Sequence, residues 1–256
     1  MAVVDIHTNK AVIEFRNTYS VQNDKTLCRY CSNNATSEGV CSNEECTEKY
    51  NKTCKRILEC GHQCNGNVDE ETCLPCLRNC SETLRQDADD MCVICFTESL
   101  AAAPSSKLVT CGHIHHTACL VNVISAGWCG PMITFGFIHC PICKVAMSHP
   151  ALDDRLAPLL ALMEDVKKKS VMRLKYDGIE FEDQFESESH AMSKYAYYQC
   201  SKCGKAYYGG EVQCQVGVDD FDPSELVCGG CSNLSHEVCP KHGTDYLEYK
   251  CRYVTH

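Results

Sequence analysis

The sequence predicts a series of small α+β modules that are stabilised by bound metal ions rather than by one large hydrophobic core. Cysteine accounts for 24 of the 256 residues, which reaches the roughly 8–10% that marks a cross-linked scaffold. Many of these cysteines stand in Cys-x2-Cys pairs with histidines among them, as zinc ligands do. The length allows two or three small domains, none able to bury a large core. Bound zinc should therefore supply much of the free energy of folding.

A secreted protein rich in disulfides is the alternative to a zinc-bound protein. No apolar run of signal-peptide length follows Met1, and histidines lie inside the cysteine clusters. A reducing, intracellular location, cytoplasmic or also nuclear, is therefore expected. No stretch approaches the roughly 18 apolar residues that span a bilayer, so membrane insertion is not expected. The formal net charge of −10 argues against nucleic acid as a partner, because phosphate binding needs a basic surface.

Residues 1–27 form an N-terminal segment with few structural signals, and residues 28–85 are predicted to be a cysteine-rich zinc module. The module shows neither helical nor strand periodicity, so we expect loops around two or three zinc ions. The ligands assigned to it are Cys28, Cys31, Cys60, His62, Cys64, Cys73 and Cys76. Cys41, Cys46, Cys54 and Cys80 also lie in this region without an assigned ion. Order along the chain does not reveal which ligands share an ion.

Residues 86–148 contain eight ligand residues in four pairs. They are Cys92 and Cys95, Cys111 and His113, His116 and Cys119, and Cys140 and Cys143. Zinc takes four tetrahedral sulfur or nitrogen ligands, so eight ligands imply two ions. The single residue between Cys111 and His113 and the interleaved order predict a cross-brace, in which pairs one and three share one ion and pairs two and four share the other. This pattern resembles a RING finger of the RING-H2 type, which binds ubiquitin-conjugating enzymes; a different binuclear zinc fold is the alternative.

Two helices and a linker are expected around and after these pairs. Ala118–Ile124 should begin a central helix between the third and fourth pairs. Residues 149–176 should form a linker helix, since their apolar positions are spaced by three and four residues. Residues 177–194 are expected to be a flexible acidic linker, because Asp177–His190 holds six acidic side chains and no Lys or Arg.

The last cysteine block lies in residues 195–256. Cys200-x2-Cys203 and Cys228-x2-Cys231 flank 24 residues and predict one complete four-thiolate zinc site. Three ligands of a second ion follow, namely Cys239, His242 and Cys251. Its fourth ligand is either His236 or His256, or the sequence ends inside the domain, which is the interpretation we favour.

Two cysteines stand apart from these ligand sets. Cys129 is expected to be a small buried hydrophobe. Cys214 follows Tyr207-Tyr208-Gly209-Gly210, a segment suited to an accessible loop between two zinc-binding pairs. A thiol in such surroundings can have a lowered pKa and act as a nucleophile, although spacing alone favours an inert structural role.

Six stretches of the chain carry a shared resemblance. They are Asp89–Glu98, Ile133–Ile138, Cys140–Lys144, Tyr195–Tyr198, Gly209–Glu211 with Cys214, and Cys239–Asp245 with Cys251–Tyr253. In this order they resemble the C-terminal catalytic region of the Pam/Highwire family, which are giant neuronal ubiquitin ligases of the RING-Cys-relay class. The resemblance runs from about residue 54 to 253, whereas the first fifty residues match poorly.

The resemblance implies a mechanism and roles for particular residues. A RING recruits a ubiquitin-charged conjugating enzyme (E2), and a tandem-cysteine domain takes over the ubiquitin for a protein substrate. The upstream cysteine, which accepts ubiquitin as a thioester, falls on Cys214, and a glutamate of the hydroxyl-transfer site falls on Glu225. The downstream cysteine, which esterifies threonine or serine, lies beyond the counterpart of Tyr253, so residues 195–256 are expected to be a partial domain.

An apolar E2-binding surface is also implied by the RING resemblance, at Ile94, Trp128 and Pro141. Ordinary core packing is the alternative for Ile94 and Trp128. Two functions from different classes remain. The first is an enzyme that carries ubiquitin on Cys214, and the second is a non-covalent RING adaptor in which Cys214 is inert or bound to metal.

Overall fold

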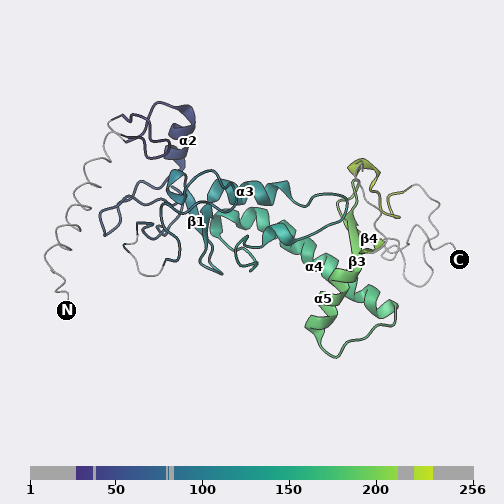
Figure 1. Ribbon diagram of the computed structural model, residues 1–256. Helices are drawn as coiled ribbons and strands as arrows, with labels where there is room; N and C mark the ends of the chain where they lie inside the picture. The colour runs from purple at the N-terminus through teal and green to yellow at the C-terminus, as the bar shows by residue number, and fades with distance from the viewer. Residues whose placement is uncertain (1–26, 37–38, 79, 81–83, 213–221, 233–256) are drawn as a thin grey trace, which may run out of the picture. The chain divides into compact units, whose positions relative to one another are not determined.

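The computed structural model describes residues 27–36, 39–78, 80, 84–212 and 222–232 (Figure 1). Contacts divide the chain into two units. Unit 1 is made of Met1–Asn122 and Cys140–Leu152, and unit 2 of Val123–His139 and Asp153–His256. Both are small α+β assemblies with short strands, helices and clusters of cysteine and histidine, which confirms the predicted fold class.

The N-terminal part of unit 1 is irregular except for one helix, α2 (Glu44–Lys52). Its N-cap is Asn43, whose side-chain oxygen accepts a hydrogen bond of 2.8 Å from the backbone N–H of Glu45. Acidic residues occupy the first turn and basic residues the last, as the helix dipole favours. The buried apolar side chains around α2 are few: Tyr30 and Val40 with the cysteines Cys28 and Cys46.

The second half of unit 1 contains the eight ligands of the predicted cross-brace. Strands β1 (Ser105–Lys107) and β2 (Ile114–His116) pair antiparallel, and helix α3 (Thr117–Ala126) begins directly after β2. Helix α3 contains Ala118–Ile124, so the central helix is confirmed.

A single core joins the two halves of unit 1. Its buried residues are Cys54, Cys64, Leu74, Leu77, Cys92, Leu100 and Ile114. The predicted boundary between residues 28–85 and 86–148 therefore runs through a shared core rather than between separate domains.

Unit 2 is built on two helices and a hairpin. Helix α4 (Asp153–Tyr176) forms within the residues where a helix was predicted, and strands β3 (Tyr195–Gln199) and β4 (Ala206–Glu211) pair antiparallel with a bulge between Ala196 and Tyr197. Residues 123–139, which were expected to belong with the RING, are part of unit 2 instead and bond to strand β3. The N–H of Ile133 donates a bond of 2.8 Å to the carbonyl of Tyr197.

The prediction of a flexible acidic linker over residues 177–194 is wrong for its second half. Helix α5 (Gln184–Lys194) forms there and contacts α4. Asp183 caps it by accepting a bond of 2.9 Å from the N–H of Glu186, and Ala191 is buried. Packing on α4 and a local cap outweigh the acidic composition, which is what had suggested disorder.

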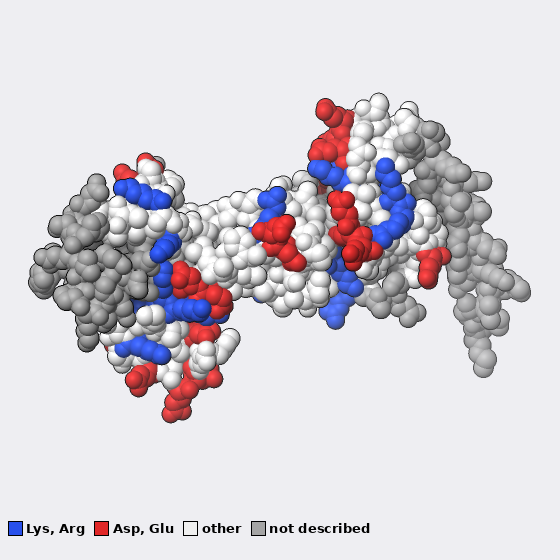
Figure 2. Space-filling model, turned by 180° about the vertical axis from the view of Figure 1, so that it is seen from behind, with Lys and Arg blue, Asp and Glu red and all other residues white. Residues whose placement is uncertain are grey.

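Charged side chains are mixed on the surface. Figure 2 shows basic and acidic groups next to one another on the face that it draws, without a continuous basic field among the described residues there. Lys167, for example, lies 2.6 Å from a carboxylate oxygen of Glu164 and 3.6 Å from one of Glu188. Within the described part of the chain, no helix is both long enough and apolar enough to traverse a bilayer.

Candidate metal centres

Clusters of four cysteine and histidine side chains recur along both units. In each, the four ligand atoms lie within 4.8 Å of one another. Zinc–sulfur bonds of about 2.3 Å in a tetrahedron hold two sulfur atoms roughly 3.8 Å apart. The spacing and the donor atoms both fit a tetrahedral metal ion.

The first cluster of the predicted cross-brace brings together Cys92, Cys95, His116 and Cys119. His116 ends strand β2, Cys119 lies in the first turn of α3, and their two positions are fixed by this strand-to-helix junction. The Nδ1 atom of His116 lies 3.7 Å from the sulfur of Cys95 and 3.8 Å from that of Cys119. Its Nε2–H donates a bond of 2.8 Å to the carbonyl of Ser99, which leaves Nδ1 directed at the cluster.

The thiols and the imidazole of this cluster alter one another's protonation. A hydrogen bond from Cys119 holds the pKa of the Cys92 thiol far below its ordinary value. Burial alone would lower the pKa of His116, but the Cys92 thiolate and the Ser99 carbonyl raise it to about 9. The cluster thus favours a thiolate at Cys92, whose hydrogen bond in turn raises the pKa of Cys119, and a cation that binds there would displace the imidazole proton.

The second cluster brings together Cys111, His113, Cys140 and Cys143. The Nδ1 atom of His113 lies 3.6 Å from the sulfur of Cys140. Pairs one and three therefore meet in one cluster and pairs two and four in the other, which is the expected cross-brace. Sequence reasoning missed His115, which is fully buried and places Nε2 at 3.7 Å from the Cys140 sulfur.

A cluster in unit 2 is made of Cys200, Cys203, Cys228 and Cys231. The sulfur atoms of Cys203 and Cys228 are 3.8 Å apart, and the N–H of Cys228 donates to the Cys200 sulfur over 3.3 Å. Burial would raise the pKa of Cys200, but backbone N–H groups lower it to about 6, so a thiolate is favoured. The grouping is the one expected from the two Cys-x2-Cys pairs.

The N-terminal ligands fall into separate sets. Cys60, His62 and Cys76 meet Cys80, with the sulfurs of Cys76 and Cys80 at 3.5 and 3.4 Å from Nδ1 of His62. Cys28 and Cys31 meet Cys41 and Cys46. Sequence reasoning had left Cys41, Cys46 and Cys80 unassigned.

Cys64 and Cys73, which the sequence assigned as ligands, belong to neither of these sets. The thiol of Cys64 instead interacts with that of Cys54, and Cys73 acts on Cys64 through its charge. The guanidinium of Arg56 donates from Nε to the Cys54 sulfur over 3.2 Å, while burial raises the pKa of Cys64 to about 12.

The residues expected to bind an E2 are placed in both units. In unit 1, Ile94 is half-buried and packs against the core shared by the two halves of the unit, and Pro141 is partly exposed. In unit 2, Trp128 is partly buried with its ring 6.4 Å from that of Phe137, in a pocket that also includes Ile124 and Pro158.

The residues with expected chemical roles are less fully placed. Glu225 is exposed at the end of a short 3-10 helix, Pro223–Glu225. Cys214 lies outside the described residues, as do Cys239, His242 and Cys251. Cys129 is exposed, so the expectation that it is buried is wrong; it sits between the turn residues Gly127 and Gly130 and not in a core.

Two curated relatives match the chain over nearly its whole length. The chain is 45% identical, in an alignment of 276 positions that covers 99% of its residues, to the protein named E3 ubiquitin-protein ligase MYCBP2 from Danio rerio. It is 44% identical, in an alignment of 281 positions that again covers 99% of its residues, to E3 ubiquitin-protein ligase highwire from Drosophila melanogaster. The chain spans 6% and 5% of the lengths of these relatives. No protein-family model matches it.

Nearly all of the first fifty residues are included in these alignments, although the resemblance seen in the sequence alone had not extended to them. The chain is therefore homologous to one short segment of each relative, in line with its resemblance to the Pam/Highwire family.

Proposed function

We propose that this chain is the catalytic region of a ubiquitin ligase of the Pam/Highwire family. Its RING recruits a ubiquitin-charged E2, and Cys214 accepts the ubiquitin as a thioester for relay toward a hydroxyl of threonine or serine. The observation that carries the proposal is the cross-brace of Cys92, Cys95, His116 and Cys119 with Cys111, His113, Cys140 and Cys143. Homology to a segment of two proteins named as ubiquitin ligases supports the same conclusion.

Zinc is the proposed occupant of these clusters, with two ions in the RING and one at Cys200, Cys203, Cys228 and Cys231. Each cluster offers four protein ligands, which leaves no open coordination position for a substrate or water. When bound, zinc supplies structural cross-links. The protein's own residues then shape the E2-binding surface and carry the ubiquitin.

The transfer to Cys214 balances without a co-reactant. The Cys214 thiolate attacks the carbonyl carbon of the thioester that joins ubiquitin to the E2 cysteine. A carbon–sulfur bond forms at Cys214, the bond to the E2 cysteine breaks, and that cysteine leaves as a thiolate. Exchange between thiols of similar pKa is nearly isoenergetic, so holding them close supplies most of the rate.

The later transfer to a hydroxyl is harder because an alcohol is a weak nucleophile until a base removes its proton. Glu225, exposed at the end of its 3-10 helix, is the described residue that we assign to this step. It lies between the Cys200–Cys203 and Cys228–Cys231 pairs along the chain, and it precedes Cys228 by three residues.

A non-covalent adaptor is the second candidate function. The clusters of unit 1 suffice for it, because a RING can bind an E2 while Cys214 stays inert or binds metal. The two candidates differ in one product, a covalent adduct between ubiquitin and this chain.

The deciding experiment incubates the chain with ubiquitin-charged E2 and looks for that adduct on a non-reducing gel. Thiol reductant should remove the adduct, and Cys214→Ser should give either no adduct or one that resists reductant, since an ester replaces the thioester. Cys129→Ser is the matched control, because Cys129 is exposed yet outside every cluster described above. An unmodified chain, with the E2 still bound, would favour the adaptor.

The E2-binding surface has its own test. Ile94→Ala should weaken E2 binding about fivefold or more, since an apolar anchor contributes over about 1 kcal/mol. Val109→Ala is the control, because Val109 is 69% exposed in the same unit and is not assigned to the surface. Unchanged affinity with a lowered unfolding midpoint would instead assign Ile94 to core packing alone.

A further inference from the structure

We infer that Cys28, Cys31, Cys41 and Cys46 bind a zinc ion, and that this ion fixes the segment between the first two RING ligand pairs. The inference concerns metal binding and stability, so it does not depend on the ubiquitin chemistry proposed above. Four thiolates in a tetrahedral arrangement are typical ligands of zinc or of an iron–sulfur centre. The geometry, the local backbone and the contacts that lead away from the cluster each support a zinc site.

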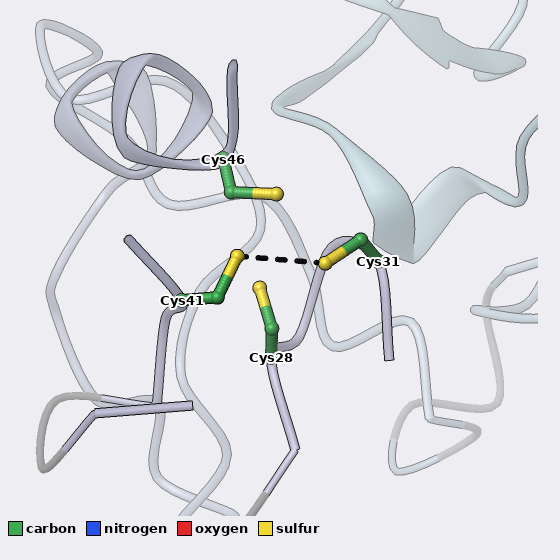
Figure 3. A group of neighbouring side chains, drawn as sticks. All are labelled: Cys28, Cys31, Cys41 and Cys46. Carbon is green, nitrogen blue, oxygen red and sulfur yellow. Dashed lines mark hydrogen bonds between the residues drawn. The ribbon is translucent and has the colours of Figure 1, made fainter. Parts of the chain in front are cut away.

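The four sulfur atoms come from three backbone segments and point toward one another (Figure 3). Cys28 and Cys31 lie on one turn, Cys41 on a loop, and Cys46 on the first turn of α2. The sulfurs lie within 4.8 Å of each other, and those of Cys31 and Cys41 are 3.5 Å apart. That distance fits two ligands of one ion and exceeds the roughly 2.05 Å of a disulfide bond.

The turn at Cys28 and Cys31 has the same backbone conformation as the two Cys-x2-Cys turns of the RING. Ser32 follows Cys31 with φ of 58°, as Phe96 follows Cys95 with 53° and Lys144 follows Cys143 with 62°. These are the three non-glycine residues of the described chain with positive φ. In each turn, the N–H of this residue donates a bond of 2.9 Å to the carbonyl of the pair's first cysteine.

A left-handed conformation is disfavoured for residues with a side chain, because the Cβ atom then lies too close to the following carbonyl oxygen. It persists where the surrounding structure imposes it. In the RING turns the two cysteines must aim both thiolates at one point, and the same requirement explains Ser32. The conformation therefore points to a shared ligand geometry.

The surrounding structure has a small hydrophobic core. Its buried cluster contains Cys28, Tyr30, Val40 and Cys46, so half of it consists of the ligands themselves. Helix α2 has nine residues, and helices this short are marginal in isolation. A metal ion bound to Cys46 would anchor α2, and the positive end of the helix dipole would favour a thiolate in its first turn.

The two residues between Cys28 and Cys31 form hydrogen bonds with residues outside the cluster. The guanidinium of Arg29 donates to the side-chain oxygen of Asn65 over 2.8 Å, and the hydroxyls of Tyr30 and Thr53 are 2.8 Å apart. An ion that closes the turn therefore fixes Arg29 and Tyr30 against the next part of the module.

Asn65 in turn forms hydrogen bonds with the segment between the first two RING ligand pairs. Its side-chain NH2 donates to the backbone carbonyls of Leu100 and Ala103, at 2.7 and 3.0 Å. Its backbone carbonyl accepts a bond of 2.9 Å from the N–H of Ser105. This segment begins at Ser99, whose carbonyl orients His116. The N-terminal ion thus supports a RING ligand through this series of hydrogen bonds.

The metal site is tested on the full chain loaded with cadmium, whose NMR shift distinguishes four-sulfur from three-sulfur, one-nitrogen sites. The described clusters predict two four-sulfur resonances, from Cys28, Cys31, Cys41 and Cys46 and from Cys200, Cys203, Cys228 and Cys231. Cys31→His keeps four ligands, so it should move one of these resonances to the three-sulfur, one-nitrogen range. Cys46→Ser should remove one resonance, and zinc per chain in the zinc-loaded protein should fall by one ion.

Several outcomes would overturn the site. One is a Cys31→His spectrum in which both four-sulfur resonances stay unchanged, and another is a wild-type zinc content that Cys46→Ser does not reduce. Iron in the purified chain, lost in Cys46→Ser, would reject zinc as the occupant. A Cys31–Cys41 disulfide, found by mass spectrometry in the chain purified under reducing conditions, would also reject the site.

The coupling to the RING is tested by hydrogen exchange at the buried amide of Ser105. In Cys46→Ser the exchange rate of this amide should rise at least tenfold. Cys203→Ser is the matched control, since it removes a ligand from unit 2 and should leave Ser105 unchanged. Equal protection of Ser105 in Cys46→Ser and wild type would refute the coupling.

Discussion

The imidazole of His116 is held between two partners: its Nε2–H donates to the backbone carbonyl of Ser99 over 2.8 Å, and its Nδ1 faces the thiols of Cys95 and Cys119. One ring nitrogen is thereby fixed as a donor and the other as a ligand. Second partners of this kind orient a metal-binding histidine and increase its basicity. The separate effects of the ligand and of the carbonyl contact can be measured by substitution.

Replacing His116 by Cys should keep the ion, because a thiolate can take the place of the imidazole. It should remove the bond to Ser99 and lower the free energy of unfolding of unit 1 by about 1 kcal/mol. His116→Ala should lose one zinc per chain and unfold the RING locally, since structural zinc contributes roughly 10 kcal/mol or more. Zinc analysis and denaturant unfolding measure both effects; full zinc content in His116→Ala would exclude this residue as a ligand.

Cys140 and Cys129 provide a contrast between a buried ligand and an exposed thiol of the same chemistry. Cys140→Ser should release the ion shared with Cys111, His113 and Cys143 and expose strands β1 and β2 to exchange. Cys129→Ser should change neither the metal content nor the unfolding midpoint by more than experimental error. If both variants retain equal zinc, the second cluster of the cross-brace is not a metal site.

Asn65→Ala should destabilise unit 1 by about 2 kcal/mol. The substitution removes the NH2 group that donates to the carbonyls of Leu100 and Ala103. It also removes the side-chain oxygen that accepts a hydrogen bond from the guanidinium of Arg29. Asn122→Ala, at an exposed position of α3, should change stability by less than about 0.5 kcal/mol. Urea unfolding of the zinc-loaded variants compares the two, and equal stabilities would show that the Asn65 contacts contribute nothing.

Gly209→Ala should weaken the hairpin of β3 and β4 by about 1–3 kcal/mol, because a Cβ there would lie 2.7 Å from Cδ2 and 2.8 Å from Cζ of the Tyr198 ring. Gly136→Ala is the control, since a Cβ at Gly136 would meet nothing within 4 Å. Truncating the ring as well, in Tyr198→Ala with Gly209→Ala, should cost at least about 1 kcal/mol less than the sum of the two single changes. Strict additivity would mean that the ring does not restrict this glycine.

The two ligand sets of the cross-brace could be predicted from sequence because their chemistry is local. The two members of each pair are separated by one or two residues, and the interleaved order of Cys92 through Cys143 leaves few ways to combine the pairs. The four-thiolate set of unit 2 follows for the same reason. Helix α4 was also predictable, since its apolar positions recur at helical spacing, and α3 was expected from its place between the third and fourth ligand pairs.

The N-terminal sets could not be assigned in this way. Cys41 and Cys46 are single cysteines, and Cys46 reaches its cluster because α2 brings it there. The helix had local signals, namely Asn43 as a cap, two glutamates after it and lysines in the last turn. The periodicity of apolar residues and the spacing of cysteine pairs, on which the sequence prediction relied, do not detect such cap and end-charge signals. Helix α5 was missed similarly, because acidic composition was given more weight than the cap at Asp183.

The residues that follow these cysteine pairs share a backbone conformation but differ in their side chains, which implies that the metal sites do not fill with equal ease. The residue after Cys203 is Gly204, which takes φ of 71° without a steric penalty, whereas Ser32, Phe96 and Lys144 adopt the same region with a side chain. When zinc is scarce, this difference favours early loading of the Cys200–Cys203 turn and later loading of the other three. Glycine at position 32, 96 or 144 would shift that order without altering a ligand, so the sequence of metal uptake is adjustable through residues that never touch the ion.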